Sequence, residues 1–70
     1  MAPRRRRYLL LVDEDLMSLI GSGDTEAFAT LYDRHNRTAY WIAYRLMGER
    51  QAAEDLVQDT FIKVWWAAGS

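Results

Sequence analysis

The pattern of hydrophobic and polar positions is clearest between Ala53 and Trp66, where it predicts one helix with two different faces. At about 100° per residue, one side gathers small and apolar residues at the spacing of a core-facing stripe. The other side mixes acids, an amide and large apolar residues, whereas a plain solvent-facing side is polar throughout. We interpret this mixed side as a docking surface for a protein partner. The core side comprises Ala53, Leu56, Val57, Thr60, Phe61 and Val64, and the mixed side comprises Asp55, Gln58, Asp59, Ile62 and Trp66.

Two further helices are predicted before this one, with no competing strand pattern. The first covers about residues 13–20, begins with three acids that complement the helix dipole, and ends at Gly21-Ser22-Gly23. The second begins after Asp24, a favourable N-cap, and runs to about Met47, where Gly48 ends it. The third helix then begins near Glu49 or Arg50. The apolar stripes are Leu16, Leu19 and Ile20 in the first helix, and Phe28, Leu31, Tyr32, His35, Ala39, Ile42, Ala43 and Leu46 in the second.

This pattern predicts an all-α fold of three helices, a short one followed by two long ones. Seventy residues allow one small domain, which we place at residues 13–68 after a basic N-terminal arm at residues 1–12. The chain has no cysteine, so it forms neither a disulfide nor a zinc–cysteine site. No apolar run reaches the roughly 20 residues of a membrane span, and we expect a cytoplasmic protein without a membrane partner.

The charge balance is uneven along the chain. The formal net charge is −1, but four positive charges are concentrated at Arg4–Arg7, so the remainder carries −5. The arginine run is either a solvated tail or an arm that contacts phosphates. An acidic body is a poor surface for nucleic acid and is better suited to a basic protein partner.

Catalytic, metal and cofactor signals are nearly absent, so we expect no enzyme activity, no metal and no cofactor. His35 is the one histidine, and its place on an apolar stripe favours a partly buried structural role over a catalytic base. Asp55 and Asp59 lie four residues apart on one side of a helix, but no second ligand motif accompanies them. The turn before Asp24 lacks the lysine of a phosphate-binding loop.

Two groups of aromatic residues have open interpretations. Tyr40, Trp41 and Tyr44 lie away from the main stripe and near Arg37. They either pack against another helix or stack with the bases of a single-stranded nucleic acid. Trp65 lies at the edge of the core stripe and is expected to be half-buried. Trp66 is either an interface residue, as tryptophan often is, or part of a solvent-exposed helix end.

Three blocks of the chain also resemble region two of bacterial sigma factors of the extracytoplasmic-function group. The resemblance extends over about residues 13–66, with the blocks in the order and at the spacing of that family. The blocks are Gly23-Asp24-Thr25-Glu26-Ala27-Phe28 with Leu31-Tyr32, then Tyr44-Arg45-Leu46-Met47-Gly48, then Ala53-Glu54-Asp55-Leu56-Val57-Gln58-Asp59-Thr60-Phe61-Ile62-Lys63-Val64-Trp65.

The resemblance implies a helical domain that takes part in transcription initiation by binding core RNA polymerase. In that family the domain docks onto the clamp helices of the largest polymerase subunit, and an anti-sigma factor is a second expected partner. The polymerase-binding residues that the resemblance implies are Asp55, Gln58 and Asp59, with Ile62 and Trp65 flanking them. We add Trp66 from its place on the mixed side of the helix, although the family usually has a polar or basic side chain there.

The chain ends at Ser70, before the family's promoter-melting segment, so we expect a sigma region-two fragment that reaches promoter DNA only through segments it lacks. The surface that the missing segment would cover is then exposed to solvent. Such a surface would favour a homodimer through Tyr40, Trp41 and Tyr44. Two alternatives to polymerase docking remain. One is a single-stranded nucleic-acid-binding module that uses Arg37, the arginine arm and the same three aromatic residues; the other is a helical oligomerisation fragment.

Overall fold

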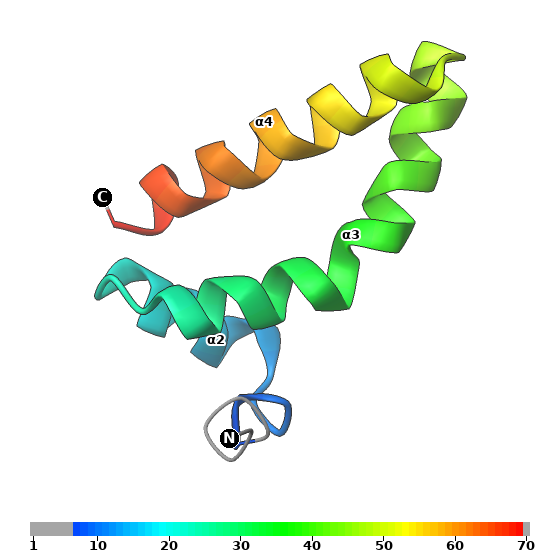
Figure 1. The fold of residues 1–70 in the computed structure, drawn as a ribbon. Helices are drawn as coiled ribbons and strands as arrows, with labels where there is room; N and C mark the ends of the chain where they lie inside the picture. The colour runs from blue at the N-terminus through cyan, green and yellow to red at the C-terminus, as the bar shows by residue number, and fades with distance from the viewer. Residues whose placement is uncertain (1–6, 70) are drawn as a thin grey trace.

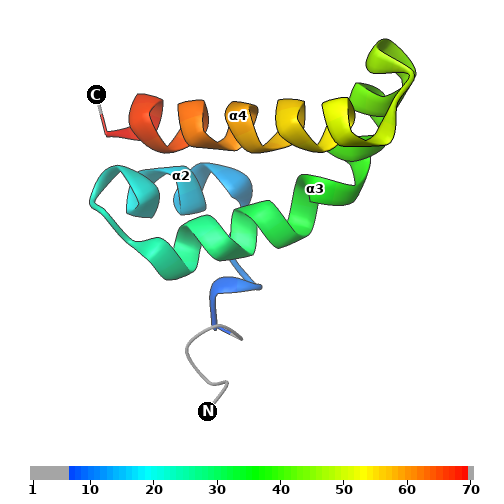
Figure 2. The same ribbon diagram turned by 45° about the horizontal axis from the view of Figure 1, so that its top comes forward.

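Three helices make up the fold in the computed structural model, which describes residues 7–69 (Figure 1). They are α2 (Asp13–Gly21), α3 (Thr25–Met47) and α4 (Arg50–Ala68). Helix α4 runs back along α3, and α2 lies beside the first half of α3 and near the end of α4 in both ribbon views (Figures 1 and 2). No strand occurs among residues 7–69. The prediction of an all-α fold with a short helix and two long ones is confirmed; Arg4–Arg6 of the arginine run lie outside the described residues.

The helix ends follow the capping residues in the sequence. The side chain of Asp24 accepts hydrogen bonds from the backbone N–H groups of Glu26 and Ala27, at 3.0 and 3.1 Å, which satisfies donors that a helix start leaves open. Glu49 caps α4 in the same way, by accepting from Ala52 at 2.8 Å. Gly48 has φ of 71°, the left-handed conformation that glycine adopts without steric cost. The predicted start and end of α3 and the predicted start of α4 are therefore confirmed, while α4 continues to Ala68, two residues beyond Trp66.

The core consists of two clusters joined by aromatic contacts. The ring of Phe28 on α3 meets Trp65 at a centroid distance of 5.3 Å and Phe61 at 6.3 Å, both edge to face. Tyr8 and Leu11, from the segment before α2, also pack against the first cluster. The first cluster contains Leu16, Ile20, Ala27 and Leu31, and the second contains Ala43, Ala53, Val57 and Phe61. The three helices thus share one continuous apolar interior.

The ends of α2 and α4 approach closely at Gly21. A Cβ atom built on Gly21 would lie 2.5 Å from the carbonyl oxygen of Ala68, closer than real contacts allow. Position 21 therefore requires glycine because a side chain would not fit, and not because of an unusual backbone conformation. This contact holds the end of α4, which carries Trp65 and Trp66, against the turn between α2 and α3.

Four residues predicted to face the core are exposed instead. Ile42 and Leu46 on α3 are 56% and 74% exposed, and Leu56 and Thr60 on α4 are also exposed. Because α2 lies beside only the first half of α3, no other part of residues 7–69 covers the outer edge of the α3–α4 pair farther along. The prediction was therefore wrong at these positions, where helical period alone cannot show how much of a stripe a partner helix covers. The four side chains line an apolar hollow of about 290 Å³, together with Ala39, Ala43 and Val57.

Candidate functional site: the outward face of α4

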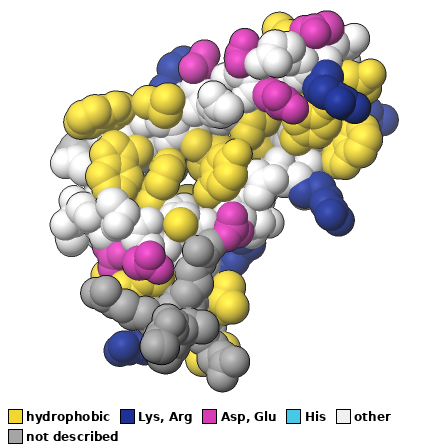
Figure 3. All heavy atoms as spheres, viewed as in Figure 1, with side chains coloured by type: hydrophobic (Ala, Val, Ile, Leu, Met, Phe, Trp, Pro, Cys, Tyr) yellow, Lys and Arg dark blue, Asp and Glu magenta, His cyan; other side chains and the backbone are white. Residues whose placement is uncertain are grey.

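The predicted docking face of α4 lies on the surface of the molecule. Asp55, Gln58 and Asp59 are exposed, while Ala53, Val57 and Phe61 on the other side of the same helix are buried. The amphipathic division of α4 follows from its 3.6-residue period. In the space-filling view, acidic side chains gather over α4 above a band of hydrophobic side chains (Figure 3).

The apolar members of the face differ in burial. Ile62 is 53% exposed and Trp66 is 70% exposed, so both place apolar side-chain area on the surface. Trp65 is half-buried, as predicted, because its ring packs on Phe28. Trp65 thus anchors the end of α4 to the core and presents part of its ring, whereas Ile62 and Trp66 offer apolar area to solvent.

Among the described residues, the acidic members of the face have no cationic partner. Within residues 7–69, neither Asp55 nor Asp59 forms an ion pair, although Asp55 accepts a hydrogen bond from the side-chain amide of Gln51 at 3.2 Å. Lys63 lies four residues after Asp59 but does not pair with it. The two carboxylates therefore remain available for charge-assisted hydrogen bonds with an external cation.

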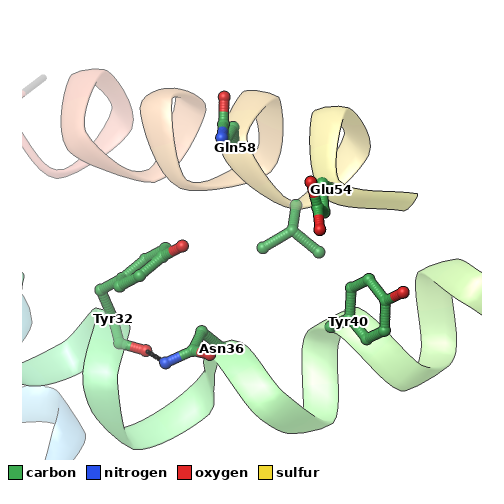
Figure 4. Close-up of a pocket in the computed structure, with 6 residues that line it drawn as sticks. Tyr32, Asn36, Tyr40, Glu54 and Gln58 are labelled. Atoms are coloured by element: carbon green, nitrogen blue, oxygen red, sulfur yellow. Dashed lines mark hydrogen bonds between the residues drawn. The ribbon is translucent and has the colours of Figure 1, made fainter. Parts of the chain in front are cut away.

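A polar cleft lies next to this face, between α3 and α4. It has a volume of about 260 Å³, and Gln58 belongs both to the cleft and to the docking face (Figure 4). The sequence pattern does not reveal this cleft. Glu54 lies on the border between the core and mixed sides of α4, and the α3 residues of the cleft are 14 or more positions before it in the chain. The lining residues are Tyr32, Asn36, Tyr40, Glu54, Val57 and Gln58.

The second predicted group, near the end of α3, is an aromatic cluster. The rings of Tyr40 and Tyr44 stack at a centroid distance of 6.0 Å, and Trp41 meets them edge to face at 5.7 and 6.1 Å. Trp41 and Tyr44 are exposed, but Tyr40 is half-buried and packs against the second core cluster. Arg37 is exposed on the same helix. Helix packing therefore accounts for the half-buried position of Tyr40, and Trp41 and Tyr44 are the more exposed rings of the cluster.

His35 makes a structural contact with the start of α2. Its Nε2 atom lies 2.6 Å from Oδ2 of Asp13, and Arg34 donates from Nη1 to Oδ1 of the same carboxylate at 2.8 Å. The hydrogen bond from Arg34 is the largest cause that lowers the pKa of Asp13, with a smaller contribution in the same direction from His35. The half-buried structural role predicted for His35 is consistent with this contact, but the sequence pattern did not indicate Asp13 as its partner.

Residues 7–69 contain neither a metal site nor a helix that could cross a membrane. Across residues 7–69, no group of three histidine, cysteine or acidic side chains is arranged to hold a metal ion. None of the helices in that range combines the length and apolar character that a membrane span needs.

Comparison with known families matches residues 31–70 to the model for sigma-70 region 2. The chain belongs to the sigma-70 region 2 family. This match includes all of α4 and most of α3, the two helices that build the docking face and the cleft. The family consists of regulatory proteins rather than enzymes.

Relatives of this region 2 chain are sigma factors from several bacteria. The chain is 34% identical over 55 residues to ECF RNA polymerase sigma factor SigK of Mycobacterium sp. (strain KMS). These 55 residues make up 79% of this chain and 28% of that protein. It is 35% identical over 46 residues to ECF RNA polymerase sigma factor SigW of Bacillus subtilis (strain 168), 66% of this chain and 25% of that protein.

RNA polymerase sigma factor NccH of Alcaligenes xylosoxydans xylosoxydans is 39% identical over 56 residues, 80% of this chain and 30% of that protein. The chain thus spans less than a third of the length of these relatives. No solved structure matches the chain significantly.

Proposed function

We propose that this region 2 chain acts in transcription initiation by docking core RNA polymerase through the outward face of α4. The partner surface is the clamp-helix coiled coil of the largest polymerase subunit. The observation that carries the proposal is the exposure of Asp55, Gln58 and Asp59 on one helix, with no ion pair to either carboxylate within residues 7–69. We place this activity in the bacterial cytoplasm, where the polymerase works.

The chemistry of the face suits a basic helical partner. Arginine side chains on the partner would donate charge-assisted hydrogen bonds to the two carboxylates, and such bonds are stronger than neutral ones. Ile62 and Trp66 would be buried beside them, which excludes water and strengthens the polar contacts. An anti-sigma factor that covers the same face would block docking directly, and it is the second partner class that we propose.

The test measures capture of the chain by immobilised clamp helices. We expect Gln58→Ala and Asp59→Asn each to weaken capture by about fivefold or more, because each loses a hydrogen bond to a charged group. Glu14→Gln is the matched control, since it alters an exposed acid on α2 and should leave capture unchanged. Circular dichroism should show the same helicity in all variants. Equal capture of every variant would refute the assigned face.

Self-association is a second proposal, favoured by the apolar hollow of Ile42, Leu46 and Leu56 and by the adjoining exposed rings of Trp41 and Tyr44. Exposed apolar area of this kind is often an interaction surface. The hollow and the docking face lie on different sides of α4, so association and polymerase docking are separable by mutation.

A further inference from the structure

The polar cleft between α3 and α4 has a composition distinct from the rest of the surface. Tyr32, Asn36 and Tyr40 line the cleft from α3, and Glu54 and Gln58 line it from α4, with the carboxylate of Glu54 directed toward α3 (Figure 4). Its volume of about 260 Å³ is below the roughly 300–1,000 Å³ of sites for drug-sized ligands. The space suits one side chain rather than a larger molecule.

Hydrogen-bond acceptors dominate the charged and amide groups of the cleft. The side-chain N–H₂ of Asn36 donates to the backbone oxygens of Tyr32 and Asp33, at 3.0 and 3.4 Å, so its Oδ1 atom remains as an acceptor. Glu54 adds a carboxylate that forms no ion pair within residues 7–69. No lysine or arginine lines the cleft. A cationic donor complements this set of atoms, whereas an anion does not.

Two tyrosine rings in the cleft favour a guanidinium over an ammonium as the bound cation. Tyr32 and Tyr40, both half-buried, flank Asn36 on α3. Tyr40 lies next to the carboxylate of Glu54, and Tyr32 lines the other end of the cleft, where its ring also packs edge to face on Phe61. A planar guanidinium stacks on aromatic rings and directs several N–H donors outward in its plane, whereas an ammonium is a compact, strongly hydrated point charge. The arrangement therefore fits an arginine better than a lysine.

An adjoining hollow indicates that the arginine belongs to a polypeptide. This hollow of about 240 Å³ shares Tyr32 and Gln58 with the cleft and is otherwise apolar, lined by Phe28, Phe61 and Ile62. A free small cation would leave it empty, but a protein partner would place a neighbouring apolar side chain there. Gln58 and Ile62 also belong to the docking face, so cleft, hollow and face are continuous.

We propose that the cleft is a guanidinium pocket for an arginine side chain of the protein that docks on α4, an identification of the partner that rests on the proposed function. Glu54 supplies the charge, Asn36 and Gln58 supply amide groups, and Tyr32 and Tyr40 supply the ring surfaces. The pocket adds a contact on α3 to a docking face that otherwise lies on α4 alone.

The pocket chemistry is tested first without any polymerase. N-acetyl-arginine amide is titrated into the labelled chain and followed by NMR, beside N-acetyl-citrulline amide, which has nearly the same shape without the charge, and N-acetyl-lysine amide. We expect saturable shifts at Glu54, Asn36 and Tyr40 with arginine, weaker shifts with lysine and none with citrulline. Glu54→Gln should abolish the arginine response, and Glu14→Gln should preserve it. Equal responses to arginine and citrulline, or an unchanged response in Glu54→Gln, would overturn the proposal.

The second measurement separates the pocket from the docking proposal. Clamp helices should bind Glu54→Gln about fivefold more weakly than the unmodified chain, with Glu14→Gln unchanged. If the clamp helices bind both variants equally, the pocket proposal fails and polymerase docking stands. A third outcome is that the clamp helices bind none of the three chains while N-acetyl-arginine amide still shifts the NMR signals of the cleft residues. In that case the docking proposal fails and the guanidinium pocket stands.

Discussion

Oδ2 of Asp13, in the first turn of α2, lies 2.6 Å from Nε2 of His35, in the middle of α3. The other oxygen of the same carboxylate accepts from Arg34, which also donates to the backbone oxygen of Leu9 at 3.4 Å. Asp13 thus ties the start of α2 to α3, and Arg34 ties the segment before α2 to α3. The side chain of Asp13 is 49% exposed, so solvent screens these contacts and their effect on stability is modest.

This contact predicts a pH-dependent contribution to stability. The pKa of Asp13 is lowered, chiefly by the hydrogen bond from Arg34. A lowered pKa in the folded state means that the contribution is present above the ordinary aspartate pKa and is lost as the pH falls through the lowered value. We expect Asp13→Asn to reduce the free energy of unfolding by less than about 1 kcal/mol at neutral pH and by almost nothing at a pH below the lowered pKa.

Urea unfolding at the two pH values measures this difference. Asp15→Asn is the matched control, because Asp15 is an exposed acid in the same helical turn and interacts with the same helix dipole. A deficit in Asp13→Asn that stays constant across the pH range, or one that Asp15→Asn reproduces, would contradict the prediction.

The N-cap of α3 gives a second prediction. Asp24 accepts from two backbone N–H groups and also from the hydroxyl of Tyr8 at 2.7 Å. Asp24→Ala removes the cap and should lower the free energy of unfolding by about 1–2 kcal/mol. Tyr8→Phe removes only the hydroxyl and should have the smaller effect, about 1 kcal/mol or less. Thermal denaturation monitored at 222 nm compares the two, and the reverse order of effects would be inconsistent with Asp24 acting as the cap.

The left-handed turn after α3 gives a third prediction. Gly48 has φ of 71° with open space around its Cα, so Gly48→Ala should cost about 1–2 kcal/mol through backbone strain rather than through a clash. Gly69→Ala is the control, because Gly69 has φ of −84° and a Cβ there would make an ordinary contact at 3.8 Å. Chemical denaturation should show a deficit in the first variant alone. Equal midpoints for the two variants would exclude this explanation.

The apolar hollow beside α4 gives a fourth prediction. If two copies associate through it, the weight-average mass in a sedimentation series should rise with concentration, and Leu46→Glu should hold the chain at monomer mass. Leu10→Glu serves as the control, since Leu10 is 84% exposed but lies before α2, far along the chain from the hollow. A monomer at every concentration in the unmodified chain would rule out self-association.

The helix boundaries were predictable because their causes are local. Asp24 and Gly48 act on backbone groups within four residues, so the sequence identifies both ends of α3 without knowledge of the fold. The outward position of Asp55, Gln58 and Asp59 was predictable for a similar reason. A regular helix fixes the angle between positions, and the buried Ala53 and Val57 orient α4.

The errors and omissions concern contacts between helices. Ile42 and Leu46 have the helical spacing of core residues, but their exposure depends on the length of α2 and on where it lies along α3. The cleft with Tyr32, Asn36 and Glu54 was missed because it depends on the register of α3 against α4. The spacing of residues within one helix gives no information about how that helix aligns with its neighbour.

The sequence by itself determined three helices, the caps at both ends of α3, the outward position of Asp55, Gln58 and Asp59, and the family, because each depends on residues that are neighbours along the chain. The tertiary structure decided which apolar positions stay exposed, which acid binds His35, and which side chains of α3 meet Glu54 across the cleft. Those outcomes depend on how far apart and at what angle the helices pack, and that geometry comes from the fit of all three helices together.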